Sequence, residues 1–537
     1  MSYTPSSTGA HAILRIGTYL RRSVRIDGRS LALFRVLIAL LVIGDVLSRA
    51  RNFSFYYTDD GPVSQELAES WTGEAFSFFY YTSDPTILGA LFAVHAGVAL
   101  LLLIGYKTRL MALLTFLFVI SLDHHNPLVL SYADTLFRLL TFWAVFLPLG
   151  ARWSVDAVHR GEPRKSFVGI ASAAVMIQMV LMYFINATNK HGSSLWRDGE
   201  AAIIVFGIDE MTFLLGNSMR AIPEFIQLGG WVWFTILFAS PLLILLQGRW
   251  RLPLLLTFMG GHLSFAITVR IGAFAYVALA GLLLFIPREF YDDVGALARR
   301  VTLAQLFTAI RPRAVRVATR LPAFSRGIRH PTVLQLRHAT YTVFMLVLVV
   351  SVAMILVLLA PHASLLWENV EEPHPDDIIQ DHSVGEEIYD RADQFGVTQP
   401  EWSIFAGPGP RSNDRYYVFP AVTTDGEQID IYNGDRELAY DRPTNELQTQ
   451  HGAYRERFYM NSVRRSNRVA TALADHLCET WEGENGEQLT QLQMYEITER
   501  ITVDTIGAPE LRERSSNRIL STSCQDARPQ IIEPPNF

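Results

Sequence analysis

The stretch VGIASAAVMIQMVLMYFI, residues 168–185, is an apolar run that ends at the polar stretch NATNKHGSSLWRDGEA, residues 186–201. A helix of about 20 apolar residues spans a bilayer because its backbone polar groups are satisfied within the helix. We therefore predict a transmembrane helix here, with Lys190 and His191 at its end. Lysine is otherwise rare, since only three of the 46 basic residues are lysine and the rest are arginine.

Similar apolar blocks recur along the 537 residues, half of which are hydrophobic. They predict a mainly α fold: a polytopic helical membrane bundle of about nine spans, followed by a C-terminal extracytoplasmic α+β domain. The first run is too long for a signal peptide and has no small-residue cleavage motif, so we expect it to be retained. The predicted spans are residues 31–48, 86–104, 110–122, 133–149, 167–187, 229–247, 251–268, 271–286 and 341–361.

The basic residues orient this bundle, because cytoplasmic loops retain Lys and Arg. With the N-terminus inside, the inner segments carry 23 basic residues and the outer loops carry 6. We therefore expect a multi-pass protein of the cell membrane. Its predicted parts are a cytoplasmic segment (1–30), a transmembrane domain (31–286), a basic cytoplasmic segment (287–340), a last transmembrane helix (341–361) and an acidic extracellular domain (362–537).

The predicted extracellular domain carries 15 Arg, no Lys and 32 acidic residues. Such a surface suits a halophilic prokaryote, and a GC-rich genome that favours arginine would explain the same bias. Its α+β fold is predicted from a β-hairpin pattern at 415–432, a helical pattern at 453–477 and a strand pattern at 489–503.

The two cysteines, Cys478 and Cys524, both lie in this external domain. They either form a disulfide or remain free thiols, and the sequence leaves both options open. The chain lacks GxxxxGK[ST], CxxC, HExxH and GxSxG motifs, so nucleotide hydrolysis, zinc proteolysis and α/β-hydrolase chemistry lack their usual residues. We expect no nucleic-acid partner.

Charged side chains inside a bilayer are costly and usually mark either a functional site or an ion pair. Arg35 and Arg138 lie within predicted spans, and Asp45 and Asp134 lie near span ends. We interpret these four residues as structural ion pairs, in which the arginines are partners of the buried acids.

A second set of polar residues gathers at the predicted outer face: Asp59, Asp60, His124, His125, Asp134, Lys190, His191 and Arg270, with His262 about two turns deeper. This convergence predicts a site. Asp59 and Asp60 are also typical of an ordinary turn before Gly61 and Pro62. Adjacent histidines on a helix point apart, and no third ligand has a clear spacing, so we predict no metal site. His262 can equally be a hydrogen-bonded core histidine.

Lys190 is the candidate with the clearest chemistry. An amine in a partly desolvated site has a lowered pKa, which makes lysine a general base near neutral pH, and arginine cannot take this role. The structural alternative is a lysine that reaches to the membrane interface, a role that arginine would fill equally well. Because the chain uses arginine almost everywhere else, we favour the catalytic interpretation.

Several ordered motifs resemble one membrane protein family. The segments LALFRVLIALLVIGDVLSR (31–49), LDHHNP (122–127), YFINATNKHGSSLWRDGEA (183–201) and GGHLSFAITVRIGAFAYVALAGLLLF (260–285) are similar to those of the HTTM (horizontally transferred transmembrane) family, which includes the vitamin K-dependent γ-carboxylase. The resemblance covers roughly residues 28–290. The external domain is far shorter than the luminal region of the animal enzyme.

The resemblance implies a quinol-dependent, carboxylase-like enzyme with an outward-facing site. It places Lys190 on the lysine that deprotonates reduced vitamin K, and it implies that His125 and His262 steady the quinone oxygens or the reactive intermediates. His124, His191 and Arg270 are further candidates for cofactor binding. A prokaryote would use reduced menaquinone, and the partners would be the lipid bilayer and an extracellular protein or peptide.

Two other classes of function remain open at this stage. A non-catalytic membrane factor for maturation, assembly or export would keep the fold, and its sign would be a structure in which Lys190, His125 and His262 lie apart. A transporter would be expected to contain inverted repeats, and the sequence has no internal repeat.

Overall fold

The computed structural model describes residues 7–73, 75–300, 312–313, 315–323, 335, 339, 390–398, 400, 402–405, 409–525 and 532–537. The predicted last transmembrane helix at 341–361 and most of the basic segment at 287–340 lie outside these residues.

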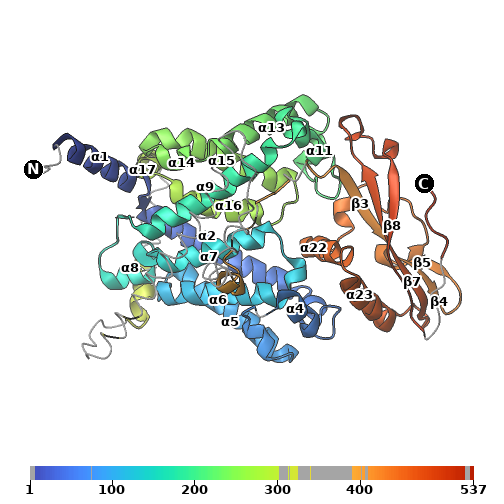
Figure 1. Ribbon diagram of the computed structural model, residues 1–537. Helices are drawn as coiled ribbons and strands as arrows, with labels where there is room; N and C mark the ends of the chain where they lie inside the picture. The colour runs from blue at the N-terminus through green and yellow to red at the C-terminus, as the bar shows by residue number, and fades with distance from the viewer. Residues whose placement is uncertain are drawn as a thin grey trace, which may run out of the picture.

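The N-terminal half is a body of packed helices (Figure 1). Its longer helices are α1 (Ser7–Ser23), α2 (Gly28–Ala50), α5 (Pro85–Ile104), α6 (Thr108–His125), α7 (Tyr132–Phe146), α9 (Ile170–His191), α13 (Pro223–Phe238), α15 (Leu252–Thr268), α16 (Phe274–Leu282) and α17 (Arg288–Arg300). Shorter helices lie between them: α3 (Phe53–Tyr57), α4 (Gln65–Thr72), α8 (Val155–Arg160), α10 (Ser194–Arg197), α11 (Glu200–Gly207), α12 (Leu215–Met219) and α14 (Leu242–Leu245).

Three of these helices, α2, α5 and α9, are long and apolar enough to cross a membrane. A fourth span results if the bent pair at 274–283 and 288–299, which turns by 95°, counts as one. Several of the other predicted spans within the described residues fall on helices that are shorter than the roughly 20 residues a bilayer requires, such as α7, α13 and α15. The membrane assignment thus holds, and the number of nine spans stays a prediction.

Local sequence signals fix the ends of several helices. The Asp27 carboxylate accepts the Arg29 backbone N–H at the start of α2. At the start of α5, the Asp84 carboxylate caps two backbone N–H groups and Pro85 takes the first helical position. This helix ends at Gly105, whose φ of 71° lies in the left-handed region that glycine adopts readily.

The C-terminal part is an α+β unit with one antiparallel sheet. Its central strand, β7 (Leu489–Arg500), pairs with β8 (Arg514–Ser523) along one edge. Along the other edge, β7 pairs with β3 (Asn413–Val418) and β4 (Pro420–Thr423), and the sheet continues to β5 (Gln428–Asp430) and β6 (Arg436–Glu437). A separate small pair, β1 (Ile26–Asp27) and β2 (Ser166–Phe167), lies in the helical body.

The three patterns predicted for this part are confirmed. β4 and β5 form the hairpin around Asp425-Gly426, and β7 is the predicted strand. The predicted helix is two helices, α22 (Tyr454–Val463) and α23 (Asn467–Thr480), which pack beside the sheet. A disulfide joins Cys478 in α23 to Cys524 just beyond β8, which settles the option that the sequence left open.

Figure 1 shows α1 at one end of the helical body and the strands at the opposite end. α22 lies between the sheet and the helices, so the two halves are in direct contact. Ser462 in α22 donates to the Leu128 carbonyl of the helical body at 3.1 Å. The end of the helical body that carries Lys190 is therefore the end that the C-terminal domain covers.

Candidate functional site

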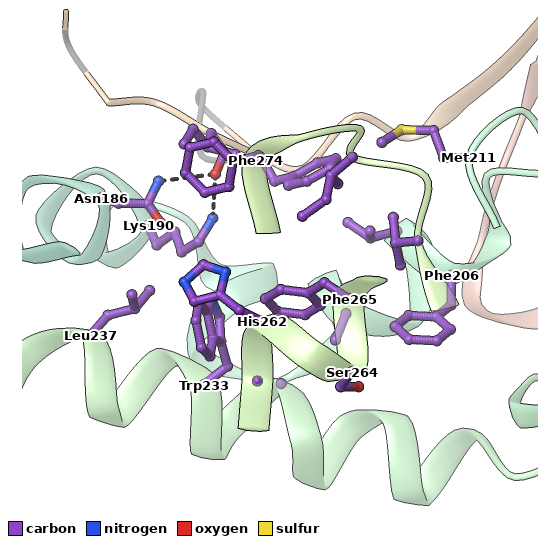
Figure 2. Close-up of a pocket in the computed structure, with 18 of the residues that line it drawn as sticks. Asn186, Lys190, Phe206, Met211, Trp233, Leu237, His262, Ser264, Phe265 and Phe274 are labelled. Atoms are coloured by element: carbon purple, nitrogen blue, oxygen red, sulfur yellow. Dashed lines mark hydrogen bonds between the residues drawn. The ribbon is translucent and has the colours of Figure 1, made fainter. Parts of the chain in front are cut away.

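A large cavity of about 860 Å³ lies where the helical body meets the C-terminal domain (Figure 2). Its walls come from α9, α13 and α15. The C-terminal domain closes it with Ser403, Ile404, Phe405, Gly409, Arg411, Tyr454, Arg457, Phe458 and Asn461. Most lining side chains are apolar, which is typical of pockets that hold an apolar ligand in a fixed orientation. The polar lining groups that the following paragraphs use are Tyr183, Asn186, Lys190, Trp196 and His262.

Lys190 occupies the last turn of α9 and is almost fully buried, with 2% of its surface exposed. Its Nζ donates to the Ile404 carbonyl at 2.6 Å and lies 3.9 Å from the centre of the Trp196 ring. Among the described residues, no carboxylate pairs with this amine. The lysine therefore points into the protein, and an interfacial anchor would reach into the solvent or headgroup region instead.

A short segment of the C-terminal domain, Trp402–Phe405, holds this amine in place. Asn186 donates to the Trp402 carbonyl at 2.7 Å and to the Ile404 carbonyl at 3.0 Å, as Figure 2 shows in part. Trp196 Nε1 donates to the Phe405 carbonyl at 2.9 Å. Trp402 and Phe405 have φ values of 48° and 53°, an unusual backbone for non-glycine residues, and such strain is often found at functional sites.

His262 lines the same cavity from α15 and is buried. The Tyr183 hydroxyl lies 2.8 Å from its Nε2, and the Trp233 ring packs edge-on against the imidazole at 5.3 Å between centroids. Its Nδ1 has no hydrogen-bond partner among the described residues. A buried, unpartnered nitrogen that lines a cavity is available to a ligand.

The predicted meeting of Lys190 and His262 in one pocket is thus observed, but His125 does not line this cavity. Its Nε2 lies 3.2 Å from the Tyr57 carbonyl, and its ring stacks on Phe79 at 5.2 Å. The end of α6 packs against α4 and residues 78–81, and His125 contacts Tyr57 and Phe79 there. The expectation that His125 shares the pocket of Lys190 is wrong.

The three remaining cofactor candidates also lie elsewhere. His124 Nδ1 lies 2.8 Å from the Phe76 carbonyl, and the guanidinium of Arg270 donates to the Gln448 carbonyl. His191 is exposed and its ring packs near Phe238, because consecutive residues of a helix point about 100° apart. Among the described residues, no group of three or more His, Cys, Asp or Glu side chains is arranged to hold a metal ion.

The two acids of the predicted structural ion pairs, Asp45 and Asp134, are paired, but with other arginines than predicted. Asp45 and Asp134 both pair with Arg49 of α2 and with Arg455 of α22. Arg455 lies in the C-terminal domain, so this buried cluster joins the two halves of the protein. The pairing was not foreseeable, because Arg455 is 410 residues from Asp45 along the chain.

Arg35 and Arg138 are not the partners of Asp45 and Asp134, which corrects the sequence interpretation. Arg35 donates to three backbone carbonyls, of Leu149, Arg152 and Trp153, at the opposite end of α2 from Asp45. Arg138 lies 3.6 Å from Asp123 of α6. Backbone carbonyls accept hydrogen bonds from both terminal nitrogens of Arg35, while its Nε has no hydrogen-bond partner among the described residues.

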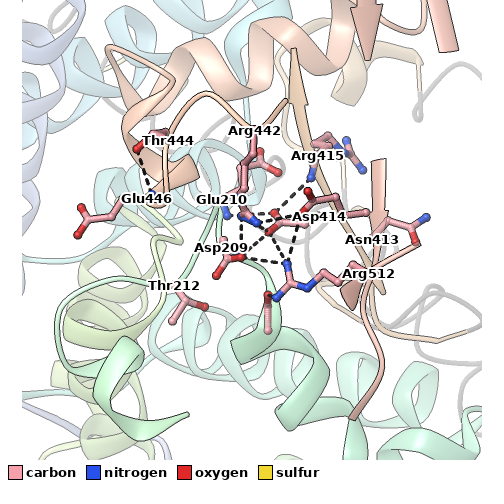
Figure 3. Close-up of polar contacts among 12 residues, drawn as sticks. Asp209, Glu210, Thr212, Asn413, Asp414, Arg415, Arg442, Thr444, Glu446 and Arg512 are labelled. Atoms are coloured by element: carbon pink, nitrogen blue, oxygen red, sulfur yellow. Dashed lines mark hydrogen bonds and ion pairs between the residues drawn. The ribbon is translucent and has the colours of Figure 1, made fainter. Parts of the chain in front are cut away.

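A second buried cluster joins the halves on the other side of the cavity (Figure 3). Arg512 lies 2.9 Å from Asp209 and 3.1 Å from Asp414, and Arg442 lies 2.6 Å from Asp209. The Asp414 carboxylate also accepts the backbone N–H groups of Asp209 and Glu210. The loop after α11 is therefore fixed to β3 by charge and by backbone hydrogen bonds together.

Sequence reasoning missed several residues of the cavity, including Tyr183, Asn186 and Trp196. Tyr183, Asn186 and Lys190 have the spacing i, i+3, i+7, which places them on one face of a helix. From the position of Lys190, this spacing could have identified Tyr183 and Asn186 as further residues of the site. Trp196 and the segment at 402–405 gave no such signal, because their contacts depend on the tertiary fold.

The family model of the HTTM domain matches residues 24–290. The chain belongs to the HTTM family. The match ends before the C-terminal domain, so it includes α9 and α15, with Lys190 and His262, and excludes the segment at 402–405. No curated protein and no solved structure matches the chain significantly.

Proposed function

We propose that this HTTM protein is a carboxylase-like membrane enzyme in which Lys190 is the general base and a reduced quinone is the cofactor. The observation that carries the proposal is a buried amine, without a carboxylate partner among the described residues, in the wall of a large apolar cavity. A structural lysine at this depth would be expected to have an acidic partner.

The residues present fit a quinone-type ring. The apolar walls suit its faces and any hydrocarbon substituent, while its oxygens require a few polar groups in fixed positions. Lys190 is one such group, and the unpartnered Nδ1 of His262 is another. When bound, a reduced quinone would supply the driving force, through its reaction with oxygen, for removing a weakly acidic C–H proton from the substrate.

The protein's own residues then have separate tasks. If the Tyr183 hydroxyl donates to His262 Nε2, the imidazole carries its proton on Nδ1 and donates it to a ligand oxygen. Lys190 takes a hydroxyl proton when its amine is uncharged. The Ile404 carbonyl and the Trp196 ring then stabilise the ammonium that this transfer produces.

The proposed location follows the positive-inside argument, with the cavity and the C-terminal domain on the extracellular side. We propose an extracellular protein or peptide as the acceptor and carboxylation, or another carbanion reaction, as the outcome. The C-terminal domain contributes residues 403–405 to the cavity wall, so an acceptor bound to this domain would lie next to the base.

The test is oxygen uptake by purified protein supplied with reduced menaquinone, together with mass spectrometry of lipids extracted from the protein. Wild type should carry a quinone and consume oxygen. Lys190→Arg should lose the uptake, because a guanidinium does not act as a base at neutral pH, while Lys165→Arg, at an exposed position, should retain it. Equal uptake by both variants would refute the role of Lys190.

A non-catalytic factor for maturation, assembly or export of an extracellular protein is the second candidate function. The position of His125, outside the cavity and bonded to a backbone carbonyl, favours this candidate. It predicts wild-type protein that neither retains a quinone nor consumes oxygen, so the same experiment separates the two functions.

A further inference from the structure

The cavity reaches the outer surface of the helical body between α13 and α15. Several of its lining residues are also exposed on that surface, namely Phe225, Gly229 and Val232 of α13 and Thr257 and Gly260 of α15. Phe225 is 58% exposed and Val232 is 45% exposed. The cavity therefore opens sideways through the wall of the helical body.

The surface around this opening is apolar. Its exposed large side chains are Leu228 and Trp231 on α13 and Leu256, Leu263 and Ile267 on α15. A contiguous apolar surface of this kind on a membrane protein faces lipid. The opening therefore lies in a surface that is suited to contact with lipid.

Two pairs of glycines give the opening its shape. Gly229 and Gly260 have no heavy atom within 4 Å of the place where a Cβ would lie, so they leave an open gap. Their neighbours Gly230 and Gly261 have the opposite role, since a Cβ on Gly230 would lie 2.6 Å from Ala202 and one on Gly261 would meet the Trp233 ring. One glycine of each pair permits close packing, and the other keeps the wall open.

The inner end of the gap leads to the candidate catalytic groups. Trp233 and Phe265 pack edge-to-face at 4.8 Å, and Trp233 in turn touches His262. A chain that enters beside Gly260 therefore passes two aromatic rings before it reaches the imidazole and Lys190. Figure 2 shows Trp233 and Phe265 beside His262.

From this arrangement we infer that the opening between α13 and α15 is a lateral entrance for an amphiphile with a polar ring and a long hydrocarbon chain. The ring lies at Lys190 and His262, and the chain runs past Trp233 and Phe265 into the lipid. The identity of the ring rests on the proposed function, whereas the path of the chain rests on the opening itself. A water-soluble ligand would gain nothing from an entrance that faces lipid.

The first test uses a cysteine at the entrance. Both native cysteines are joined in a disulfide, so Gly260→Cys introduces the one free thiol. In lipid nanodiscs, this thiol should react with a hydrophobic N-alkyl maleimide at least tenfold faster than with a charged, membrane-impermeant maleimide. Reaction with the charged reagent at the same rate would show an aqueous opening and overturn the inference.

The second test blocks the gap and compares two quinones that share a ring. Gly260→Leu should lower the retention of menaquinone-4 about tenfold and leave the binding of menadione, which has no chain, unchanged. Gly44→Leu is the matched control, because Gly44 is an exposed helical glycine of α2 with equally open surroundings, away from the cavity.

Loss of both quinones in Gly260→Leu, or loss of neither, would overturn the lateral entrance. Wild-type protein that binds neither quinone would refute the proposed quinone chemistry. In that case the maleimide test still decides whether the opening faces lipid, so failure of the entrance and failure of the proposed function give different results.

Discussion

The replacement of Lys190 by methionine separates a catalytic lysine from a structural one. Methionine keeps the unbranched chain and nearly the same volume, and it can fill the space that the lysine occupies. The change removes the hydrogen bond from Nζ to the Ile404 carbonyl, but Asn186 still donates to that carbonyl at 3.0 Å. No buried acceptor is therefore left without a partner.

The expected change in stability is small because a general base is uncharged in the resting protein. Loss of the neutral hydrogen bond from Nζ to the Ile404 carbonyl costs about 0.5–1.5 kcal/mol. The apolar end of methionine requires no hydrogen bond in the apolar cavity wall, which offsets part of this cost. We therefore expect the free energy of unfolding to fall by less than about 1.5 kcal/mol.

The rate should change far more than the stability. A positioned general base contributes roughly 10²–10⁴-fold to a reaction rate, which corresponds to about 3–5 kcal/mol of activation free energy. The assays are quinol-dependent oxygen uptake and thermal unfolding followed by tryptophan fluorescence, with Lys165→Met as the exposed control. Uptake at the wild-type rate would refute the role of Lys190 as the base, and destabilisation by 3 kcal/mol or more would identify it as a structural residue.

Three further predictions concern the C-terminal domain and its contacts with the helical body. Arg512→Met should destabilise the protein by about 3 kcal/mol, measured by thermal unfolding, because it removes one of the arginines that pair with the buried Asp209 and Asp414. Replacement of both Cys478 and Cys524 by serine should cost about 4 kcal/mol, from the 46-residue separation that the disulfide closes, measured in the same way. Burial alone would raise the pKa of Glu210, but the ion pair with Arg411 holds it well below its usual value of 4.5. This pair therefore stabilises the protein above pH 4.5, the stabilisation is lost as the pH falls through the lowered pKa, and Glu210→Gln should reduce the acid sensitivity of the unfolding midpoint.

The elements that could be predicted from the sequence are those that depend on residues close together in the chain. The hairpin at Asp425-Gly426 follows from a turn dipeptide between alternating residues, and α9 follows from a long apolar run. The shared cavity of Lys190 and His262 was also foreseeable, because Lys190 was expected at the outer end of one span and His262 about two turns below the outer face in another. Each of these inferences requires only short-range patterns and a topology.

The sequence fails where the cause is a contact between distant segments. His125 follows His124 at the end of a helix, and only the packing of Tyr57 and Phe79 decides that it turns away from α9. The Ile404 carbonyl lies 214 residues from Lys190 along the chain. No periodicity encodes such a contact, so the closing of the cavity by the C-terminal domain could not be predicted.

The cluster of Asp209, Asp414 and Arg512 can form only after the end of the C-terminal domain has been translated. Asp209 and Arg512 are 303 residues apart. At about 5–20 residues per second, a ribosome needs roughly 15–60 s to proceed from one to the other. During that interval Asp209 has Arg220 as a nearby partner but lacks Arg512, and the C-terminal domain that covers the cavity is incomplete. A nascent protein in this state exposes its candidate base until the C-terminal domain has folded. A protease that cuts the loop after α11 would then degrade unfinished molecules and leave finished ones intact.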